Sequence, residues 1–589
     1  MKYIIPILFL SCSLFGQSLR LDQNSRYNHF IDRLDILYGG LPGYSTAIKN
    51  HDTKALAIWL VANLDELFAI DKSEARHFLN QYNFQNFEEA TRNNTLKHYV
   101  DSSNVFYTIN EEEKISENIY TDQKPILKYF FKNPHHFYSL NTKDLQLRLD
   151  PIFDISSGYA KDDTNTVFRN TRGLRINGYI DDKIYFHTEI VENQARFNNY
   201  VEDYINEYDA IPGYGLYKDY KSAIIKKLSG HDFLTARGYV GLPISKSVSI
   251  ELGHSNHLLG NGMRSLLLSD FSNSYFYLKF NTRVWKLNYQ NIFAELNAVS
   301  PNGLPGDQLV PKKYMANHFL TIALRKNLEF GLFETVIFSR ENHFEFQYLN
   351  PIILYRFVEH SIGSPDNVIL GTNFKWNPFN GMSLYGQFAL DEFNTAFLNQ
   401  SDWWANKYAV QGGIKYLNIL GVNQLDGQAE VNIVRPYTYS HGSSIEALPN
   451  QSVSNYSHNN LTLAHPLGSN FKEFMLSLRY RPSNRLLIAG RINYAQKGLD
   501  EDGKNYGGNI LTSNESRVDD YGVTLLQGNV NTIKTMVLNV QYEIFKNFYL
   551  DLNCLARNSS YEEATLSDKK TLFIGLGVRA NMAKEEHNF

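Results

Sequence analysis

Cysteine is nearly absent from this sequence, which has two in 589 residues. Cys12 lies in the apolar N-terminal segment, so Cys554 is left alone in the remainder, which cannot form an internal disulfide. Basic charge is not in excess either: the formal net charge is −4, whereas a nucleic-acid-binding protein needs a concentrated basic face. Beyond the N-terminus, no run approaches the ~18 uninterrupted apolar residues of a membrane helix. These absences exclude a disulfide scaffold, a nucleic-acid partner and a bundle of membrane helices.

The first residues have the pattern of a secretory signal. Lys2 supplies an early positive charge, residues 3–10 form an apolar core, and small or polar residues follow. This core is too short to span a bilayer, and we expect residues 1–17 to be a cleaved signal peptide. A lipoprotein would instead be acylated at Cys12, but the two residues before it fit such a site poorly.

Residues 18–143 hold the helical patterns of the chain. Apolar side chains at three- and four-residue spacings form one stripe behind Asp52, which is a plausible helix cap. The members of the stripe are Leu56, Trp59, Leu60, Leu64, Leu67 and Phe68. A second helix is predicted to begin at Asp71, with Glu74 three residues on. We expect a small helical domain that packs against the rest of the protein and has no chemistry of its own.

From residue 144 to the C-terminus the apolar period is two. In "TMVLNVQYEIF", Met536, Leu538 and Val540 alternate with more polar positions, as on a strand with one apolar and one polar face. Aromatic residues make up 14% of the chain, which suits a large sheet with interfacial rings. The apolar face could meet a second sheet in a sandwich or lipid in an outer-membrane barrel, and alternation alone does not separate the two.

Connection length separates them. Eighteen strands are predicted, near 145–155, 166–179, 183–193, 233–242, 247–255, 274–282, 284–295, 316–325, 328–338, 366–377, 381–391, 405–417, 424–435, 472–481, 485–496, 535–544, 547–557 and 571–581. Short turns such as "RKN" (325–327) alternate with long polar connections such as 436–471. Outer-membrane barrels have short periplasmic turns, long external loops and an even strand number. The sequence therefore predicts an all-β transmembrane barrel of about 18 antiparallel strands in residues 144–589, with the helical domain in the periplasm.

One predicted external connection is unexpectedly apolar. Residues 349–360, "LNPIILYRFVEH", lie between the strands near 328–338 and 366–377. An exposed loop of this kind would be prone to aggregation. We expect it to fold into the barrel mouth as a plug, with Arg356 and Glu359 meeting charged wall residues. A second such segment, His254–Ser272, is expected to constrict the barrel in the same way.

Three stretches carry a resemblance to a known family. They are "RYNHFIDRLDILYGG" (26–40), "NHLLGNGMRSLLLSDFSNSYFYLKFNTRVWKLNYQNIFAEL" (256–296) and "FEFQYLNPIILYRFVEHSIGSPDNVILG" (344–371). Together they resemble the capsule assembly family typified by Wzi, in a branch that includes relatives associated with gliding motility. The resemblance implies an eighteen-stranded outer-membrane barrel with a periplasmic helical bundle, closed to free diffusion, that helps to hold capsular polysaccharide at the cell surface.

Candidate site residues fall into two groups. The first group would line a plug or the lumen, although each residue is equally explained as one that packs a loop: Arg264, Asp270, Glu345, Asn350, Tyr355, Arg356, Glu359 and Asp366. The second group is the external stretch "DWWANKY", in which Trp403, Trp404 and Tyr408 could stack on the apolar faces of sugar rings. Ordinary loop polarity explains the second group equally well.

Catalytic motifs were not found in the sequence. It contains no GxSxG, Walker-type or HExxH pattern, and His254 and His257 have no evident third partner for a metal. We therefore expect no enzyme activity, catalytic residue, metal or cofactor. The expected partners are surface polysaccharide and outer-membrane lipid. The alternatives are a diffusion channel or transporter, and an accessory component of gliding motility or protein secretion that would also contact envelope proteins.

Overall fold

A computed structural model describes residues 19, 21, 25–39, 45–49, 51–82 and 135–584. The last range has gaps at 143, 162, 164, 182, 223–227, 305, 307, 341–342, 353, 364–365, 393–400, 443, 446–447, 502 and 564–565. The predicted signal peptide, residues 1–17, lies outside the described residues, as do residues 83–134.

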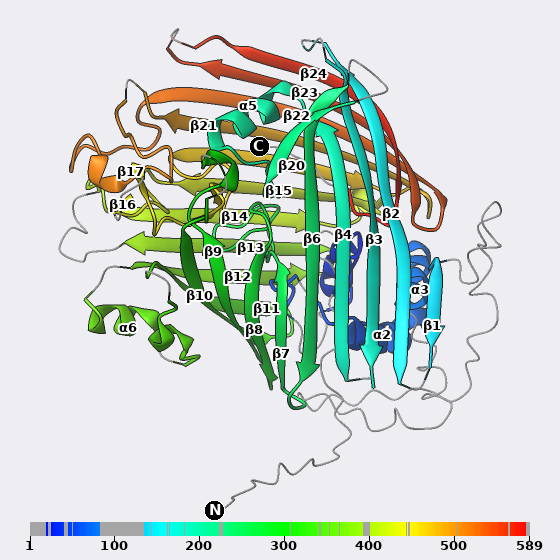
Figure 1. The fold of residues 1–589 in the computed structure, drawn as a ribbon. Helices are drawn as coiled ribbons and strands as arrows, with labels where there is room; N and C mark the ends of the chain where they lie inside the picture. Colours follow the sequence, from blue (N-terminus) through cyan, green and yellow to red (C-terminus); the bar gives the residue numbers. More distant parts are fainter. Residues whose placement is uncertain are drawn as a thin grey trace, which may run out of the picture.

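Eighteen antiparallel strands form one closed wall (Figure 1). They are β2 (Leu145–Ala160), β3 (Val167–Ile180), β4 (Ile184–Arg196), β6 (Ser229–Pro243), β7 (Val248–Ser255), β8 (Tyr275–Val284), β9 (Leu287–Asn297), β10 (Lys312–Arg325), β11 (Leu328–Phe338), β12 (Asn367–Phe379), β13 (Met382–Glu392), β14 (Lys407–Tyr416), β15 (Leu425–Val434), β20 (Phe471–Tyr480), β21 (Leu486–Leu499), β22 (Asn529–Phe545), β23 (Phe548–Tyr561) and β24 (Lys569–Ala580). Every predicted strand overlaps one of them, so the predicted barrel is confirmed.

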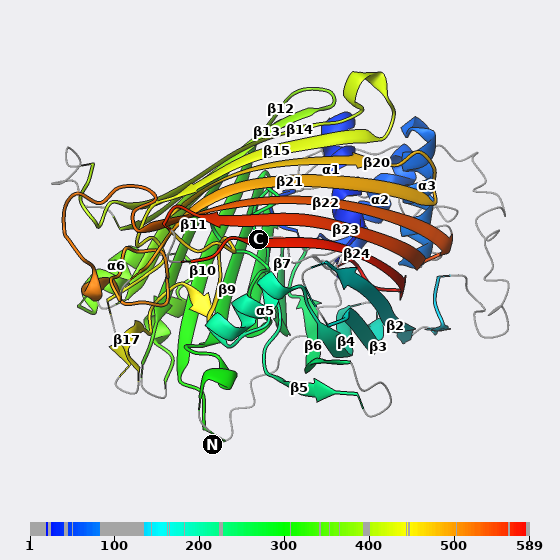
Figure 2. The ribbon, with the colours of Figure 1, turned by 90° about the horizontal axis from the view of Figure 1, so that it is seen from above.

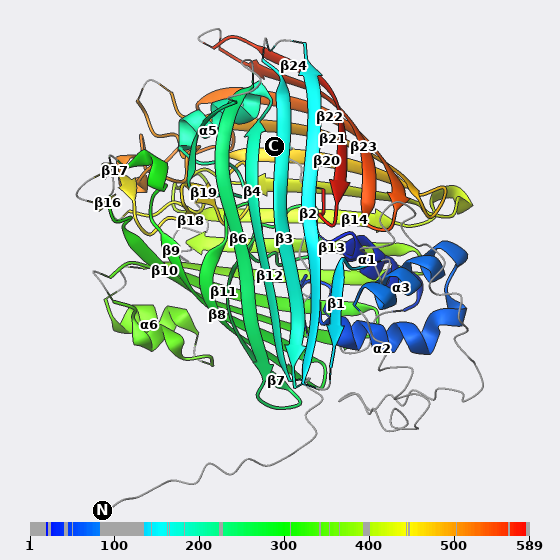
Figure 3. The same cartoon turned by 45° about the vertical axis from the view of Figure 1, so that its right-hand side comes forward.

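The wall closes where the first and last strands meet. β2 pairs with β24 from Phe153↔Ala580 to Ala160↔Phe573, and Figures 2 and 3 show β24 beside β2. Closure satisfies the backbone groups that an open sheet edge would leave unpaired in lipid. The short strands β1 (Tyr138–Asn141) and β5 (Tyr217–Lys221) pair alongside β2 and β6, respectively, and are not part of the closed ring.

The two ends of the barrel differ in their connections. At one end, called here the short-turn end, the connections range from two residues (546–547) to eight (417–424). At the other, the long-loop end, they include 197–228, 339–366, 435–470 and 500–528. The long-loop connections carry α5 (Asn199–Tyr208), α6 (Tyr355–Ser361) and the two small hairpins β16 (Ser444–Ile445) with β17 (Leu448–Ser452) and β18 (Ser457–His458) with β19 (Leu461–Thr462).

Alternate residues along each strand face opposite sides of the wall. Apolar side chains on the outer side remain more than half exposed, for example Ile155 (58%), Leu234 (62%), Met536 (59%) and Leu576 (59%). Polar side chains such as Lys375 face inward and are buried. This inverted distribution, apolar outside and polar inside, is that of a barrel surrounded by lipid.

Three helices precede the barrel strands in the sequence: α1 (Tyr27–Leu37), α2 (Thr53–Asn63) and α3 (Ala69–Gln81). Asp52 caps α2 as predicted, because its carboxylate accepts hydrogen bonds from the backbone N–H groups of Lys54 and Ala55. The second predicted helix begins at Ala69, two residues before Asp71. Among the described residues, no helix is long and apolar enough to cross a membrane.

The helices share one apolar core. It contains Leu21, Tyr27, Phe30, Ile31, Leu34, Leu56, Ala57, Trp59, Leu60, Leu67, Ala75 and Phe78. Most of the predicted stripe is therefore buried, but Phe68 is 49% exposed. The core uses one side of α1, and the charged side of α1 is left for contacts with the barrel.

Candidate functional site

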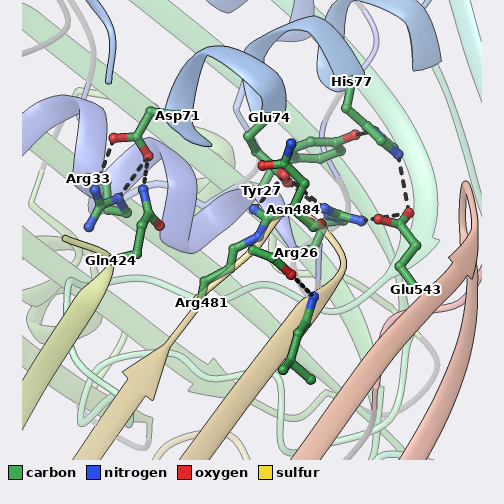
Figure 4. A network of polar contacts seen from close by, with 12 residues as sticks. Arg26, Tyr27, Arg33, Asp71, Glu74, His77, Gln424, Arg481, Asn484 and Glu543 are labelled. Atoms are coloured by element: carbon green, nitrogen blue, oxygen red, sulfur yellow. Dashed lines mark hydrogen bonds and ion pairs between the residues drawn. The ribbon is translucent and has the colours of Figure 1, made fainter. Parts of the chain in front are cut away.

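The N-terminal helices are attached to the short-turn end of the barrel by buried charges (Figure 4). Arg33 of α1 binds both carboxylate oxygens of Asp71 on α3, at 3.0 and 2.9 Å, and both of Asp426 on β15, at 2.7 Å. The side chains of all three residues are at most 3% exposed. One guanidinium therefore joins two helices to the wall.

A second junction involves Glu74 of α3. Its carboxylate accepts from Arg26 at 2.8 Å and from Arg481, directly after β20, at 2.6 Å. Burial would raise the pKa of Glu74, but the charges of Arg26 and Arg481 outweigh burial and hold the pKa well below its ordinary value. The stabilisation is therefore present above the ordinary carboxyl pKa of about 4.3 and is lost only as the pH falls towards the depressed value.

Further pairs continue along α1 into the lumen. Asp32 accepts from Lys415 of β14 at 2.6 Å, and Asp35 accepts from Lys375 of β12 at 2.9 Å. Ser45 then donates to Glu329 of β11 at 2.8 Å. The N-terminal region therefore reaches into the short-turn end of the barrel, where its side chains pair with charged residues of the wall.

The segment His254–Ser272 enters the lumen from the long-loop end. Its backbone is held by inward side chains of three strands: Leu266 N donates to Gln387 at 2.8 Å, Met263 N donates to Glu430 at 2.7 Å, and Arg264 O accepts from Gln411 at 3.0 Å. Leu266, Leu267 and Leu268 are fully buried. Of the candidate residues, Arg264 and Asp270 therefore lie inside the barrel.

Two segments enter the barrel, the N-terminal region from the short-turn end and His254–Ser272 from the long-loop end, and these two intruding segments meet inside it. Gly260 N donates to Ala47 O at 2.7 Å, and Ile48 forms a β-bridge with Leu259. Gly260 has φ +123°, and a side chain there would come within 2.1 Å of Gln387 Nε2, so only glycine fits this close approach. The lumen is thus filled from both ends along one side.

Loops over the long-loop end cover this segment. Tyr439 and Tyr456 are fully buried, and their hydroxyls donate to Leu266 O at 2.7 Å and to Leu267 O at 2.6 Å. The nearby stretch "NYSHNN" (455–460) is also buried. Its side-chain amides form hydrogen bonds within the barrel mouth; for example, Asn455 Oδ1 accepts from Lys313 Nζ at 2.7 Å.

A cavity of about 490 Å³ remains next to α1 at the short-turn end. Arginines dominate its lining, among them Arg26, Arg479, Arg481, Arg491 and Arg579. Partners lie close by for some of them: Glu74 binds Arg26 and Arg481, and Asp551 binds Arg579 at 2.9 Å. The cavity therefore leaves open space beside the segments that enter the barrel.

The structure corrects the predicted position of Leu349–His360. Figures 1 and 3 show α6 outside the barrel wall and away from α1–α3. Arg356 and Glu359 do pair, at 2.6 Å, but within α6 rather than across the mouth. The pattern was ambiguous because an apolar segment leaves water equally well by entering a lumen or by lying on a lipid-facing surface.

The other candidates in this connection also lie outside the lumen. Asp366 accepts from Arg340 at 2.8 and 2.7 Å and from the hydroxyl of Tyr348 at 2.7 Å. Glu345 is 3.6 Å from Arg340, and Asn350 accepts from Ile352 N at 3.0 Å. Tyr355 is fully buried against the outer surface of the wall.

The aromatic candidates divide between two surfaces. Trp403 and Trp404 lie at the long-loop end with ring centroids 6.2 Å apart, and the guanidinium of Arg517 lies 4.1 Å from the Trp404 centroid. Tyr408 instead faces outward on β14, where it stacks with Phe388 at 6.3 Å. The structure therefore brings Trp403 and Trp404 together with Arg517 and places Tyr408 on the membrane side.

Sequence reasoning missed two sets of residues. The charges of α1 recur at Arg26, His29, Asp32 and Arg33, a spacing that gives a charged stripe opposite the apolar one and could have suggested a buried polar partner. Arg517 had no local signal, because it is far from Trp404 in the sequence and only the fold brings them together.

An eighteen-stranded closed barrel with an apolar outer belt and a polar lumen defines a class, the outer-membrane β-barrel proteins. The family model described as "Capsule assembly protein Wzi" matches residues 163–571. The chain therefore belongs to the Wzi family of capsule assembly proteins, and it is an outer-membrane protein.

Solved structures give weaker likenesses. One is Wzi of Escherichia coli, described as an outer-membrane protein involved in group 1 capsule assembly and a carbohydrate-binding β-barrel, at 14% identity, TM-score 0.46, and 73% of this chain against 85% of that one. Others are OprD of Pseudomonas aeruginosa, at 10% identity, TM-score 0.38 and 74% against 94%, and OpdK of the same organism, at 8%, 0.41 and 74% against 98%. No curated protein sequence matches the chain.

Proposed function

We propose that the protein binds surface polysaccharide at its long-loop end and holds it at the cell surface during capsule assembly. Membership of the capsule assembly family carries this proposal. The filled lumen supports it, because the buried segment Leu266–Leu268 and the N-terminal helices occupy the path that a transported polymer would take. The same filling argues against a diffusion channel. The proposed role is binding, without a catalytic step.

Trp403, Trp404 and Arg517 are the part of the long-loop end best suited to sugars. Arg517 covers one face of Trp404 and also binds Asp520 at 2.6 Å. Trp403 is half-buried beside it, so its ring can stack on the apolar face of a sugar. The guanidinium and the neighbouring carboxylates of Asp402 and Asp520 would bond sugar hydroxyls.

Replacing Trp403 by alanine should weaken polysaccharide binding about tenfold, which corresponds to ~1.4 kcal/mol. The reason is the loss of one stacking surface without loss of a buried anchor. Binding of purified capsular polysaccharide to the detergent-solubilised protein would be measured by titration calorimetry. Trp285→Ala is the matched control, because Trp285 is 54% exposed but lies in a turn at the short-turn end. Equal weakening in both variants would contradict the proposed site.

We also propose that the long-loop end faces the exterior and that α1–α3 attach from the periplasm, as outer-membrane barrels have their long loops outside. Epitope tags inserted after Gly503, in the 500–528 connection, should bind antibody on intact cells. Tags after Asn380 or Pro482, in short turns, should bind it only after the outer membrane is permeabilised. Labelling of the short-turn tags on intact cells would invert the orientation.

A further inference from the structure

Residues 344–352 and 354–361, named here the flap, lie against the outer surface of the barrel. The flap comprises Phe344, Glu345, the turn Phe346–Leu349, residues 350–352 and 354, and α6. Its buried side chains form a cluster with outward side chains of β9–β12, whose members are Phe293, Ala316, Val336, Phe338, Tyr348, Tyr355, Val358 and Val368. The wall residues in this cluster alternate with lumen-facing ones, such as Thr335 and Ile337 on β11. The flap therefore packs on the membrane side.

The flap covers a polar patch that would otherwise face lipid. His318 of β10 and Glu334 of β11 both point outward, 3.7 Å apart, and are only 6% and 3% exposed. The ring of Tyr355 lies 4.0 Å from that of His318, and Arg356 N donates to Glu334 at 3.1 Å. A carboxylate on the lipid face of a barrel is destabilising unless it is shielded. The flap supplies that shield.

The outer face of the flap is apolar and uncovered within the part of the chain that the structure describes. Phe346 is 76% exposed, Ile352 84%, Leu354 54% and Phe357 68%. In water, this many exposed apolar side chains on a short segment would be unfavourable. Their neighbours on the wall, Leu332 (50%) and Leu370 (39%), belong to the exposed outer belt of the barrel. The flap face therefore continues a surface that already meets lipid.

The height of the flap along the wall supports the same conclusion. Its base is at the long-loop rim, where Asp366 binds Arg340 and Tyr348. Its tip reaches down to Tyr289 of β9, whose hydroxyl donates to Pro351 O. In the strand register, Tyr289 is level with Leu320 and hence with Leu332, near the middle of β11. Ile352, beside the tip, is thus held against the outer surface of the wall, away from the long-loop rim.

The charges of the flap are compatible with this depth. Glu359 is buried and bound by Arg356, so the pair is neutral within α6. The Arg356 side chain is 63% exposed, and a long arginine can extend towards the head groups while its stem stays among acyl chains. His360 follows near the end of α6, from which the chain returns to Asp366 at the rim.

We propose that the flap is embedded in the membrane, with Phe346, Ile352, Leu354 and Phe357 docked among the acyl chains of the outer leaflet. The flap replaces the lipid-facing surface over the His318–Glu334 patch, so the barrel presents lipid with an apolar exterior there. This surface is independent of the polysaccharide-binding proposal, because it lies on the side of the barrel and not over its mouth. Its occupant is lipid and not a second protein.

Spin labels provide the test, using the full chain with Cys554→Ser reconstituted in phospholipid vesicles. Ile352→Cys and Phe357→Cys each receive a nitroxide label, and collisions with apolar oxygen and with a water-soluble nickel chelate are compared. Leu332→Cys is the lipid-facing control. Leu309→Cys is the aqueous control, because Leu309 is 87% exposed in the connection between β9 and β10. Heat-dependent electrophoretic migration checks that each variant forms the barrel.

We expect the oxygen-to-nickel ratio at residues 352 and 357 to match that at 332 and to exceed that at 309. Nickel access equal to that at 309 would place the flap in water and overturn the proposal. Protection from both reagents would mean that another part of the protein or a second copy covers the flap, and would overturn it equally. The tag and polysaccharide experiments do not depend on either result.

Discussion

Replacing Arg33 by alanine should weaken the attachment of the N-terminal helices to the barrel. Arg33 is the shared partner of Asp71 and Asp426, and its removal leaves two buried carboxylates without the guanidinium, of which Asp426 keeps the contact with His29 at 2.9 Å. Breaking a buried ion pair by removing one member destabilises by about 3–5 kcal/mol. The expected result is rapid cleavage of residues 25–82 by protease added from the short-turn side, while the barrel remains resistant.

Two further variants make the Arg33 prediction specific. Arg76→Ala is the matched control, because Arg76 lies on α3 but is exposed, and its loss should change cleavage little. Adding Asp71→Asn and Asp426→Asn to Arg33→Ala removes the buried charges that cause the loss and should restore part of the protection. An Arg33→Ala protein as resistant as the wild type would show that the ion pairs do not hold the helices in place.

In planar bilayers the wild-type protein should pass no steady current, and stepwise conductance should appear only when both intruding segments are removed. An eighteen-stranded wall encloses more space than its own side chains can fill, so removal of the obstructions should leave an aqueous pore. Deleting residues 25–82 alone leaves Leu266–Leu268 in place under Tyr439 and Tyr456. Replacing 257–269 alone by a Gly-Ser linker leaves α1 bound to Asp426 and Lys375.

Two conductance results would contradict this account of the lumen. A large steady current through the wild type would contradict the filled lumen. A double variant that inserts, migrates as a folded barrel and still passes no current would show that other loops are sufficient to close it. Replacing Leu349–His360 should not open the pore, because this segment lies outside the wall.

The barrel could be predicted from the sequence because its signals are local and repeated. In each strand, apolar and polar side chains alternate between the outer and the inner face. In β22, for example, Met536, Leu538 and Val540 lie on one face, and Val537 and Asn539 lie on the other. Alternation of short with mostly long connections then indicated the strand number and parity, although the 161–166 connection at the long-loop end is shorter than 417–424 at the other. Lipid imposes these rules on every strand, so errors at single positions average out.

The filling of the barrel could not be predicted in the same way. The charges of α1 matter because Asp426, Lys375 and Lys415 lie opposite them, and these contacts join residues more than 300 positions apart. The predicted position of the flap was wrong for a different reason. Its apolar character was recognised, but hydrophobicity gives no direction, and only the outward His318 and Glu334 identify the surface that it covers.

Retention of polysaccharide by cells tests the proposed function most directly. A strain lacking this protein would be compared with the same strain expressing the wild-type chain or Trp403→Ala, and polysaccharide bound to cells would be measured against that released into the medium. We expect the deletion strain to release polysaccharide, the wild-type chain to restore retention, and Trp403→Ala to restore it only in part. Full retention of polysaccharide by the deletion strain would contradict a role for the protein in holding it at the cell surface.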